Sequence, residues 1–285
     1  MKKFSLGALA FTLLMLGAVS CQKDQLNQNK EVPLEVISKL EKLGFNPDGI
    51  EVIAEGYRIE RDIIITPEFL SSTPAIHTVP DAEQYSTNNL VNAANYGTIS
   101  IYIPVETSGG GRGNKGTSGF SATYVAALDE AIARYNAENL TISFTRASQS
   151  NNADIVFTRL SKGEERQGIL GSSGFPTASG DPYGEVKMSG ILQSRYNIQQ
   201  AGIATIMAHE LGHCIGFRHT DYYDRSISCG GSPTDEGASS IGANQIPGTP
   251  ATADLAGNGS WMLSCTNGSS RPFTPYDKVA LAYLY

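Results

Sequence analysis

The spacing of apolar and polar residues predicts that helices and strands alternate along most of the chain. Strands are expected where apolar and polar positions alternate, because successive side chains of a strand point to opposite faces. Helices are expected where apolar residues recur every three or four positions and so form one stripe. The predicted strands are residues 98–105, 141–145, 153–160 and 184–189, and the predicted helices are residues 33–43, 121–139, 198–215 and 274–285.

The N-terminal part of the chain has a weaker pattern. Residues 50–53 and 57–65 are expected to form strands, and residues 66–94, which contain three prolines, are expected to form a linker or extended segment. We therefore divide the sequence into an N-terminal region, residues 32–94, and a larger domain, residues 95–285.

The first residues have the pattern of an export signal followed by a lipid attachment site. Two lysines precede an apolar run, residues 6–19, which is too short to span a bilayer. The stretch that ends at Cys21 resembles a bacterial lipobox, in which the cysteine is lipidated. We expect residues 1–20 to be a signal peptide, Cys21 to anchor the protein in the cell envelope, and residues 21–31 to form a tether. Plain secretion is the alternative, and either route exports the protein.

Composition and charge narrow the classes of function. The chain has 285 residues, with 21 basic and 28 acidic side chains and a net charge of -7. Such a balance argues against a phosphate-binding surface, so we expect no nucleic-acid partner and no membrane contact beyond the anchor. Cys214, Cys229 and Cys265 permit one disulfide in an oxidising compartment, and the sequence leaves their pairing open.

The strongest chemical signal is a window of eleven residues that holds three of the four histidines. It runs from His209 to His219 in the pattern HExxHxxGxxH. His209 and His213 are four positions apart on a predicted helix, so both rings can reach one ion. Gly216 can adopt the left-handed conformation that ends a helix, which turns the chain and brings His219 to the same ion. Three imidazole nitrogens suit one zinc ion and leave its fourth position open for water.

Glu210 and Met262 complete the predicted site. Glu210 follows the first histidine but points elsewhere, so we expect it to take the proton of a metal-activated water and return it to the leaving amine. A purely structural zinc site would need no such carboxylate. A methionine such as Met262 is by itself more often core filler. Its position 43 residues after His219 fits a turn that packs beneath the ligands and supports them.

These motifs resemble those of the metzincin clan, and over residues 95–285 the chain is similar to the bacterial dual-action HEIGH metallopeptidase family. The resemblance implies an α+β fold: a zincin-like catalytic domain with a mixed, mostly parallel five-stranded sheet, an active-site helix, and a loop-rich C-terminal subdomain that ends in a helix. It also implies one zinc ion held by His209, His213 and His219. The matching residues are 127–132, 135–136, 174–176, 209–221, 246–250, 260–262 and 276–278.

The sequence therefore predicts a zinc-dependent endopeptidase that acts on proteins or peptides. The strand near residues 183–189 is expected at the sheet edge beside the cleft, where an extended peptide can pair with it. The alternative is a cell-surface lipoprotein that keeps the zinc site but acts by adhesion or protein binding, and an intact Glu210 favours the enzyme. Cleavage specificity, structural calcium and oligomeric state are not determined by the sequence.

The N-terminal region, residues 32–94, allows two interpretations: a pro-segment that covers the cleft, or a permanent layer of the fold. No cysteine lies between Cys21 and Cys214, which excludes a cysteine of this region as a block on the metal. An acidic residue such as Asp62 could fill the open metal position instead. The alternative role of Asp62 is a charge on the surface of a strand.

Overall fold

The structure is a computed structural model, and it describes residues 32–42, 45–71, 84–106, 119–238, 241–250, 253, 255 and 259–285, all within one unit of the chain. The predicted signal peptide, Cys21 and the predicted tether lie outside the described residues. None of the described helices is long and apolar enough to cross a membrane.

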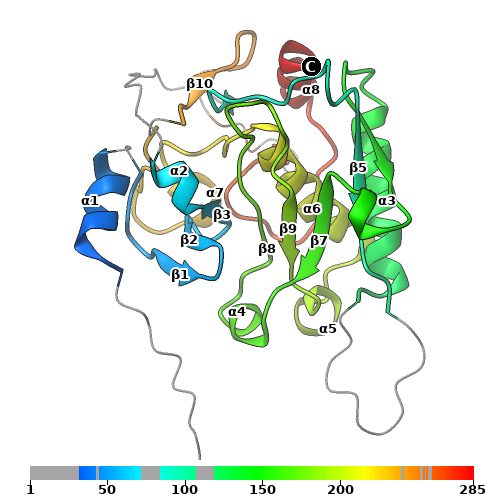
Figure 1. The fold of residues 1–285 in the computed structure, drawn as a ribbon, viewed down its shortest axis with the longest axis horizontal. Coiled ribbons are helices and arrows are strands. Elements are labelled where there is room, and N and C mark those ends of the chain that lie inside the picture. Colours follow the sequence, from blue (N-terminus) through cyan, green and yellow to red (C-terminus); the bar gives the residue numbers. More distant parts are fainter. Residues whose placement is uncertain are drawn as a thin grey trace, which may run out of the picture. The chain divides into compact units, whose positions relative to one another are not determined.

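The predicted mixed sheet of five strands is confirmed. Four strands are parallel, and β8, at one edge, is antiparallel to its neighbour β9. Figure 1 shows that β8 is the strand on the side of the N-terminal elements. In spatial order the strands are β6 (Ser143–Arg146), β5 (Thr98–Tyr102), β7 (Ile155–Arg159), β9 (Glu185–Met188) and β8 (Gly171–Ser172).

The predicted position of the sheet edge is wrong. β9 lies within the stretch predicted as the edge, residues 183–189, but it pairs with β7 on one side and with β8 on the other. The edge is β8, which is only two residues long. A Gly-Ser pair has no alternation of apolar and polar positions, so the pattern could not reveal it.

The central helix is α6 (Gln200–Ile215), and its position explains its sequence. Every residue from Gly202 to Ile215 is buried, as expected of a helix that is apolar on all sides and passes through a core. It packs against α3 (Ala122–Asn136) and contacts β8 and β9, and Figure 1 shows it behind these strands. The predicted histidine window therefore lies next to the edge strand.

The remaining elements of the larger domain are short, apart from the last helix. α8 (Pro275–Leu284) begins with a capping box formed by Thr274 and Asp277. β4 (Tyr85–Ser86) pairs with β10 (Asn244–Gln245), which attaches the end of the N-terminal region to C-terminal loops. The predicted boundary between residues 94 and 95 stays a prediction. The other elements are a 3-10 turn (Ser150–Asn152), α4 (Lys162–Arg166), α5 (Leu192–Tyr196) and α7 (Ser226–Cys229).

The N-terminal elements form a small antiparallel sheet with its own apolar cluster. The single strand predicted at residues 57–65 is wrong in part, because a turn divides it where Glu60 and Arg61 have φ angles of 55° and 77°. Phe175 and Ile241 of the larger domain complete the apolar cluster. The elements are α1 (Leu34–Lys42), β1 (Glu51–Ile53), β2 (Gly56–Ile59), β3 (Ile63–Ile65) and α2 (Pro67–Ser71).

Candidate metal centre

The three histidines of the window meet at one point. His209 and His213 lie one turn apart on α6, and Gly216, with φ of 109°, ends this helix in the left-handed conformation that the sequence predicts. The chain then turns and brings His219 back to the same side. The Nε2 atom of His213 lies 3.1 Å from Nε2 of His209 and 3.2 Å from Nε2 of His219.

The opposite ring nitrogens show which atoms can bind a metal. Nδ1 of His209 lies 2.9 Å from the carbonyl oxygen of Trp261, and Nδ1 of His213 lies 2.8 Å from that of Phe217. A carbonyl oxygen only accepts, so each Nδ1 carries the proton and each Nε2 has a free lone pair. Tetrahedral zinc with Zn–N distances of about 2.0–2.1 Å holds its nitrogens about 3.3 Å apart, which agrees with the spacing observed here.

Burial favours the neutral form of the central ligand. It lowers the pKa of His213 well below the usual value, and the two neighbouring histidines lower it further. A neutral imidazole is the form that binds a metal ion. The donor set therefore fits one metal ion without a proton having to leave His213 first.

Glu236 positions the third histidine, and no sequence signal pointed to it. Its Oε1 lies 2.8 Å from Nδ1 of His219, and both side chains are fully buried. Burial alone would raise the pKa of Glu236, but His219, Arg225 and Arg218 together outweigh it and lower the pKa to about 2. A carboxylate bonded to the far side of a metal-binding histidine fixes the ring and makes it a stronger ligand. Glu236 belongs to a polar loop without periodicity, so no sequence pattern indicated it.

Glu210 lies beside the histidines and faces the edge strand. Its carboxylate is buried, and the Ser173 hydroxyl donates to Oε2 at 2.7 Å. Gly171 on β8 leaves room for it, since a Cβ there would lie 2.2 Å from Oε1 of Glu210. Burial, and after it the charge of Asp62, raises the pKa of Glu210 well above the usual range. A carboxylate whose pKa is raised from its ordinary value is a stronger base, which favours a role in general acid–base chemistry.

The turn at Met262 packs against α6, the helix that carries two of the histidines. Met262 is fully buried, and a Cβ on Gly212 would lie 2.5 Å from its Sδ. Its carbonyl oxygen accepts a hydrogen bond of 2.9 Å from the N–H of Thr220, the residue after His219. The neighbouring Trp261 carbonyl holds His209. The turn therefore fixes two of the three histidines from one side, through its backbone.

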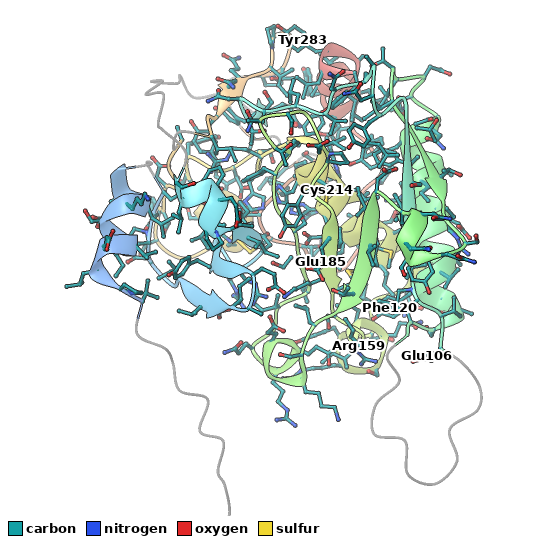
Figure 2. The ribbon with its side chains drawn as sticks, viewed as in Figure 1. Glu106, Phe120, Arg159, Glu185, Cys214 and Tyr283 are labelled. Atoms are coloured by element: carbon teal, nitrogen blue, oxygen red, sulfur yellow. A yellow bond between two sulfur atoms is a disulfide. The ribbon has the colours of Figure 1, made fainter. Side chains whose placement is uncertain are left out.

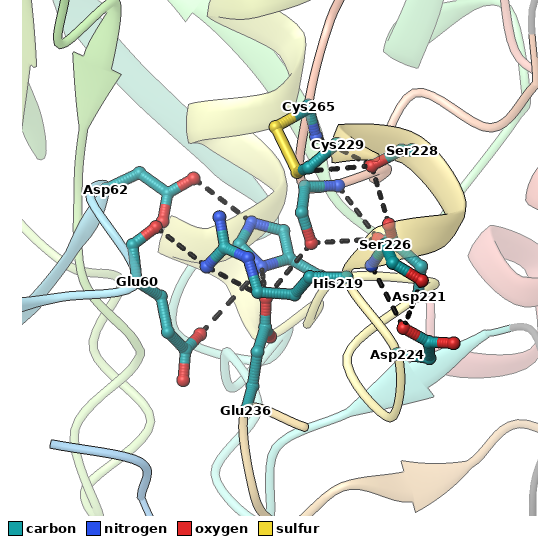
Figure 3. Close-up of a disulfide and its surroundings, with 12 residues drawn as sticks. Glu60, Asp62, His219, Asp221, Asp224, Ser226, Ser228, Cys229, Glu236 and Cys265 are labelled. Atoms are coloured by element: carbon teal, nitrogen blue, oxygen red, sulfur yellow. Dashed lines mark hydrogen bonds and ion pairs between the residues drawn. A yellow bond between two sulfur atoms is a disulfide. The ribbon is translucent and has the colours of Figure 1, made fainter. Parts of the chain in front are cut away.

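A disulfide closes the loop region next to the site. Cys229 bonds to Cys265, while Cys214 is free and buried on α6 (Figure 2). The carboxylate of Asp221 accepts from the Ser228 hydroxyl at 2.6 Å and from the backbone N–H of Ser264 at 2.9 Å, so it ties both sides of the bridge together. Figure 3 shows this network beside His219 and Glu236. The loop that carries Glu236 is thereby held near the histidines.

Asp62 joins the ligand cluster from the N-terminal elements. Its Oδ2 lies 3.1 Å from Nε2 of His219 and 3.7 Å from Nε2 of His209. One ligand atom from each of Asp62, His209, His213 and His219 lies within 4.8 Å of the others. Asp62 therefore lies in the candidate metal centre rather than on the surface of a strand. Figure 3 shows its side chain pointing toward His219. Three nitrogens and one carboxylate oxygen complete a four-coordinate donor set.

Comparison with known proteins identifies the class of this site. A sequence profile matches residues 57–285, which include all four members of the ligand cluster, and it describes a metallopeptidase. The chain belongs to the dual-action HEIGH metallo-peptidase family. The fold and the histidine cluster are consistent with the catalytic domain of a zincin.

Two further comparisons add no argument about function. No curated protein matches the chain. Among solved structures, one similar chain comes from "GM1 bound form of the ECX AB5 holotoxin"; it is 16% identical, and the match covers 73% of this chain and 81% of that one. The TM-score is 0.33, too low to support a statement about fold or activity.

Proposed function

We propose that this metallopeptidase is a zinc-dependent endopeptidase, with Glu210 as its general base and acid. One observation carries the proposal: three buried histidines bring their Nε2 atoms together beside a buried carboxylate. The all-nitrogen histidine set favours zinc over calcium or magnesium, which prefer oxygen ligands. Proteins or peptides are the substrates, in keeping with the family.

The side chains around the ligands would each perform one task. Zinc bound by the histidines would lower the pKa of a water molecule and polarise the carbonyl of the scissile bond. Glu210 would accept a proton from the water that attacks the carbonyl carbon, and it would transfer this proton to the amine nitrogen as the C–N bond breaks. Ser173 holds the carboxylate of Glu210 in place through Oε2. An extended substrate would pair with the main chain at β8 beside Glu210, in place of the N-terminal backbone that bonds to Ser173 there in this structure.

A lipoprotein that binds zinc but acts only by adhesion is the second candidate. It would need the histidines but not a base with a raised pKa. The buried Glu210, its hydrogen bond to Ser173 and the space that Gly171 leaves for it all favour the enzyme. We therefore retain adhesion only as the outcome of a negative assay.

The test is hydrolysis of casein by the zinc-loaded full-length chain. Because Asp62 lies among the ligands, the assay uses both the wild type and the Asp62→Ala variant. In whichever of the two is active, Glu210→Gln should lower the rate at least ~10²-fold while the zinc content stays unchanged, since it removes the base and leaves the ligands. Casein left intact by both zinc-loaded proteins would exclude the endopeptidase.

We also propose that the protein is exported and anchored through Cys21. The proposal is supported by the sequence pattern alone: two lysines, the apolar run at residues 6–19 and the lipobox-like residues before Cys21. Mass spectrometry of the protein purified from its native cells tests it. A mature chain that begins at a lipid-modified Cys21 is expected, and an unmodified chain that still begins at Met1 would contradict export.

A further inference from the structure

We propose that the N-terminal cover, defined as residues 32–42 and 45–71, inhibits the peptidase from within the same chain. In the inhibited protein Asp62 is the fourth metal ligand, and the backbone around it pairs with the outer edge of β8. The inference rests on the proposed function, because it describes how that same site is blocked; we call this blocked form the closed state. Three separate sets of contacts support it.

The first set is at the metal centre. Oδ2 of Asp62 lies 3.1 Å from Nε2 of His219 and 3.7 Å from Nε2 of His209. A tetrahedral ion held by three histidines has one position left, and the reaction needs that position for water. A carboxylate oxygen bound there keeps water out of it. The same side chain that completes the donor set therefore removes the nucleophile.

The second set is at the sheet edge. The N–H of Ser173 donates to the carbonyl oxygen of Asp62 at 2.8 Å, and the N–H of Ile64 donates to the carbonyl oxygen of Ser173 at 2.7 Å. Ile63 forms a parallel bridge with Ser173, so the cover extends the sheet beyond β8. These are the main-chain groups that an extended substrate would use. The cover thus fills both parts of the site, the metal position and the substrate edge.

The third set fixes the cover just before Asp62. Arg58 is fully buried, forms an ion pair with Glu164 and donates from Nε to the Ser172 hydroxyl at 3.2 Å. Two residues further on, the carbonyl oxygen of Glu60 accepts a hydrogen bond from Arg225 at 2.9 Å. Glu164, Ser172 and Arg225 all belong to the larger domain. Because these contacts hold the turn that leads to Asp62, this residue is presented to the metal as a preorganised ligand.

The physical consequence is competition within the chain. A ligand attached to its own site acts at an effective concentration of the order of millimolar or higher, so an external ligand of moderate affinity must displace it. Removing the carboxylate should free the fourth position while the cover remains folded. Metal access can thus be measured without relying on peptide hydrolysis.

The experiment measures the binding of acetohydroxamate, a small bidentate metal ligand, to the full-length protein loaded with Co²⁺. The visible absorption of Co²⁺ reports its coordination. We expect Asp62→Ala to change this spectrum and to bind the probe at least ~10-fold more tightly than the wild type. Asp48→Ala, which changes an exposed aspartate of the same cover, is the matched control and should behave as the wild type. Asp62→Asn keeps the shape of the side chain, so it serves as the second variant if Asp62→Ala does not fold.

The outcomes separate this inference from the proposed function. Equal probe affinity in the wild type and both Asp62 variants would overturn the inference, as would casein hydrolysis by the wild type at the rate of Asp62→Ala. Tighter probe binding by the Asp62 variants supports it, whether or not they cut casein. If those variants bind the probe tightly but leave casein intact, the closed state stands and the endopeptidase assignment fails.

Discussion

At the scale of single residues, the site depends on glycine positions, which leave space, as well as on its functional side chains. Gly171 and Gly212 are pressed against functional groups, the carboxylate of Glu210 and the sulfur of Met262. Neither glycine has a φ angle that requires glycine, so the reason for each is the space it leaves. The identity of these residues is therefore set by the site rather than by the backbone.

Gly171→Ala tests this point. The added methyl group would lie 2.2 Å from Oε1 of Glu210, so the carboxylate must move or β8 must shift. We expect a loss of peptidase activity of at least ~10-fold, because a small displacement of a catalytic group strongly lowers the reaction rate. The zinc affinity should stay nearly unchanged, because the histidines are not displaced. The matched control is Gly184→Ala, whose Cβ would meet its nearest atom at an ordinary 3.6 Å. Both variants are made in the Asp62→Ala background, in which the proposed inhibition is removed, and equal activity of the two would contradict the argument.

At the scale of elements, the start of α8 is bonded to the turn that supports the histidines. Asp277 caps the helix through Thr274, accepts from the Gln84 amide at 2.6 Å and faces the backbone N–H of Trp261. It is fully buried, and burial raises its pKa from 3.8 to about 6. The folded protein therefore binds this proton more tightly than the unfolded chain does.

The pH dependence of stability follows from that difference. The contribution of Asp277 is fully present below pH 4 and is lost as the pH rises through 6, by at most about 3 kcal/mol. Asp277→Asn does not titrate, so the free energy of unfolding of the wild type should fall relative to the variant between pH 4 and pH 8. Urea unfolding of both metal-free proteins measures this. Curves that stay parallel over the whole range would show that Asp277 titrates normally.

The sequence predicted the elements whose signal is local. α3 and α6 have apolar stripes or runs of several turns, α8 has a capping box, and the window from His209 to His219 fixes three ligands within a single helix and turn. The rest depends on partners that are distant in sequence. Asp62 is 157 residues from His219, and the edge strand β8 has two residues, so neither has a pattern of its own. Asp62 could be named only as one acidic candidate, and Glu236 not at all.

At the scale of the whole molecule, the metal centre joins parts of the chain that would otherwise meet only through packing. Two ligands come from α6, one from the loop after it and Asp62 from the N-terminal cover, which has its own apolar cluster. An ion bound by all four links the unfolding of the cover to that of the larger domain. An ion bound by the histidines alone would not.

This linkage predicts how zinc protects the chain. A ligand that binds only the folded state at 1,000 times its Kd stabilises it by about 4 kcal/mol, which for a domain of this size raises Tm by on the order of 10 °C. We expect this rise in the wild type and its loss in EDTA. Hydrogen exchange should also slow at Ile64 on β3, whose N–H bonds to Ser173 beside the site. In Asp62→Ala zinc should still raise Tm, but exchange at β3 should no longer respond, because the ion no longer holds the cover. Protection of β3 by zinc in both proteins would mean that packing, rather than Asp62, couples the two parts.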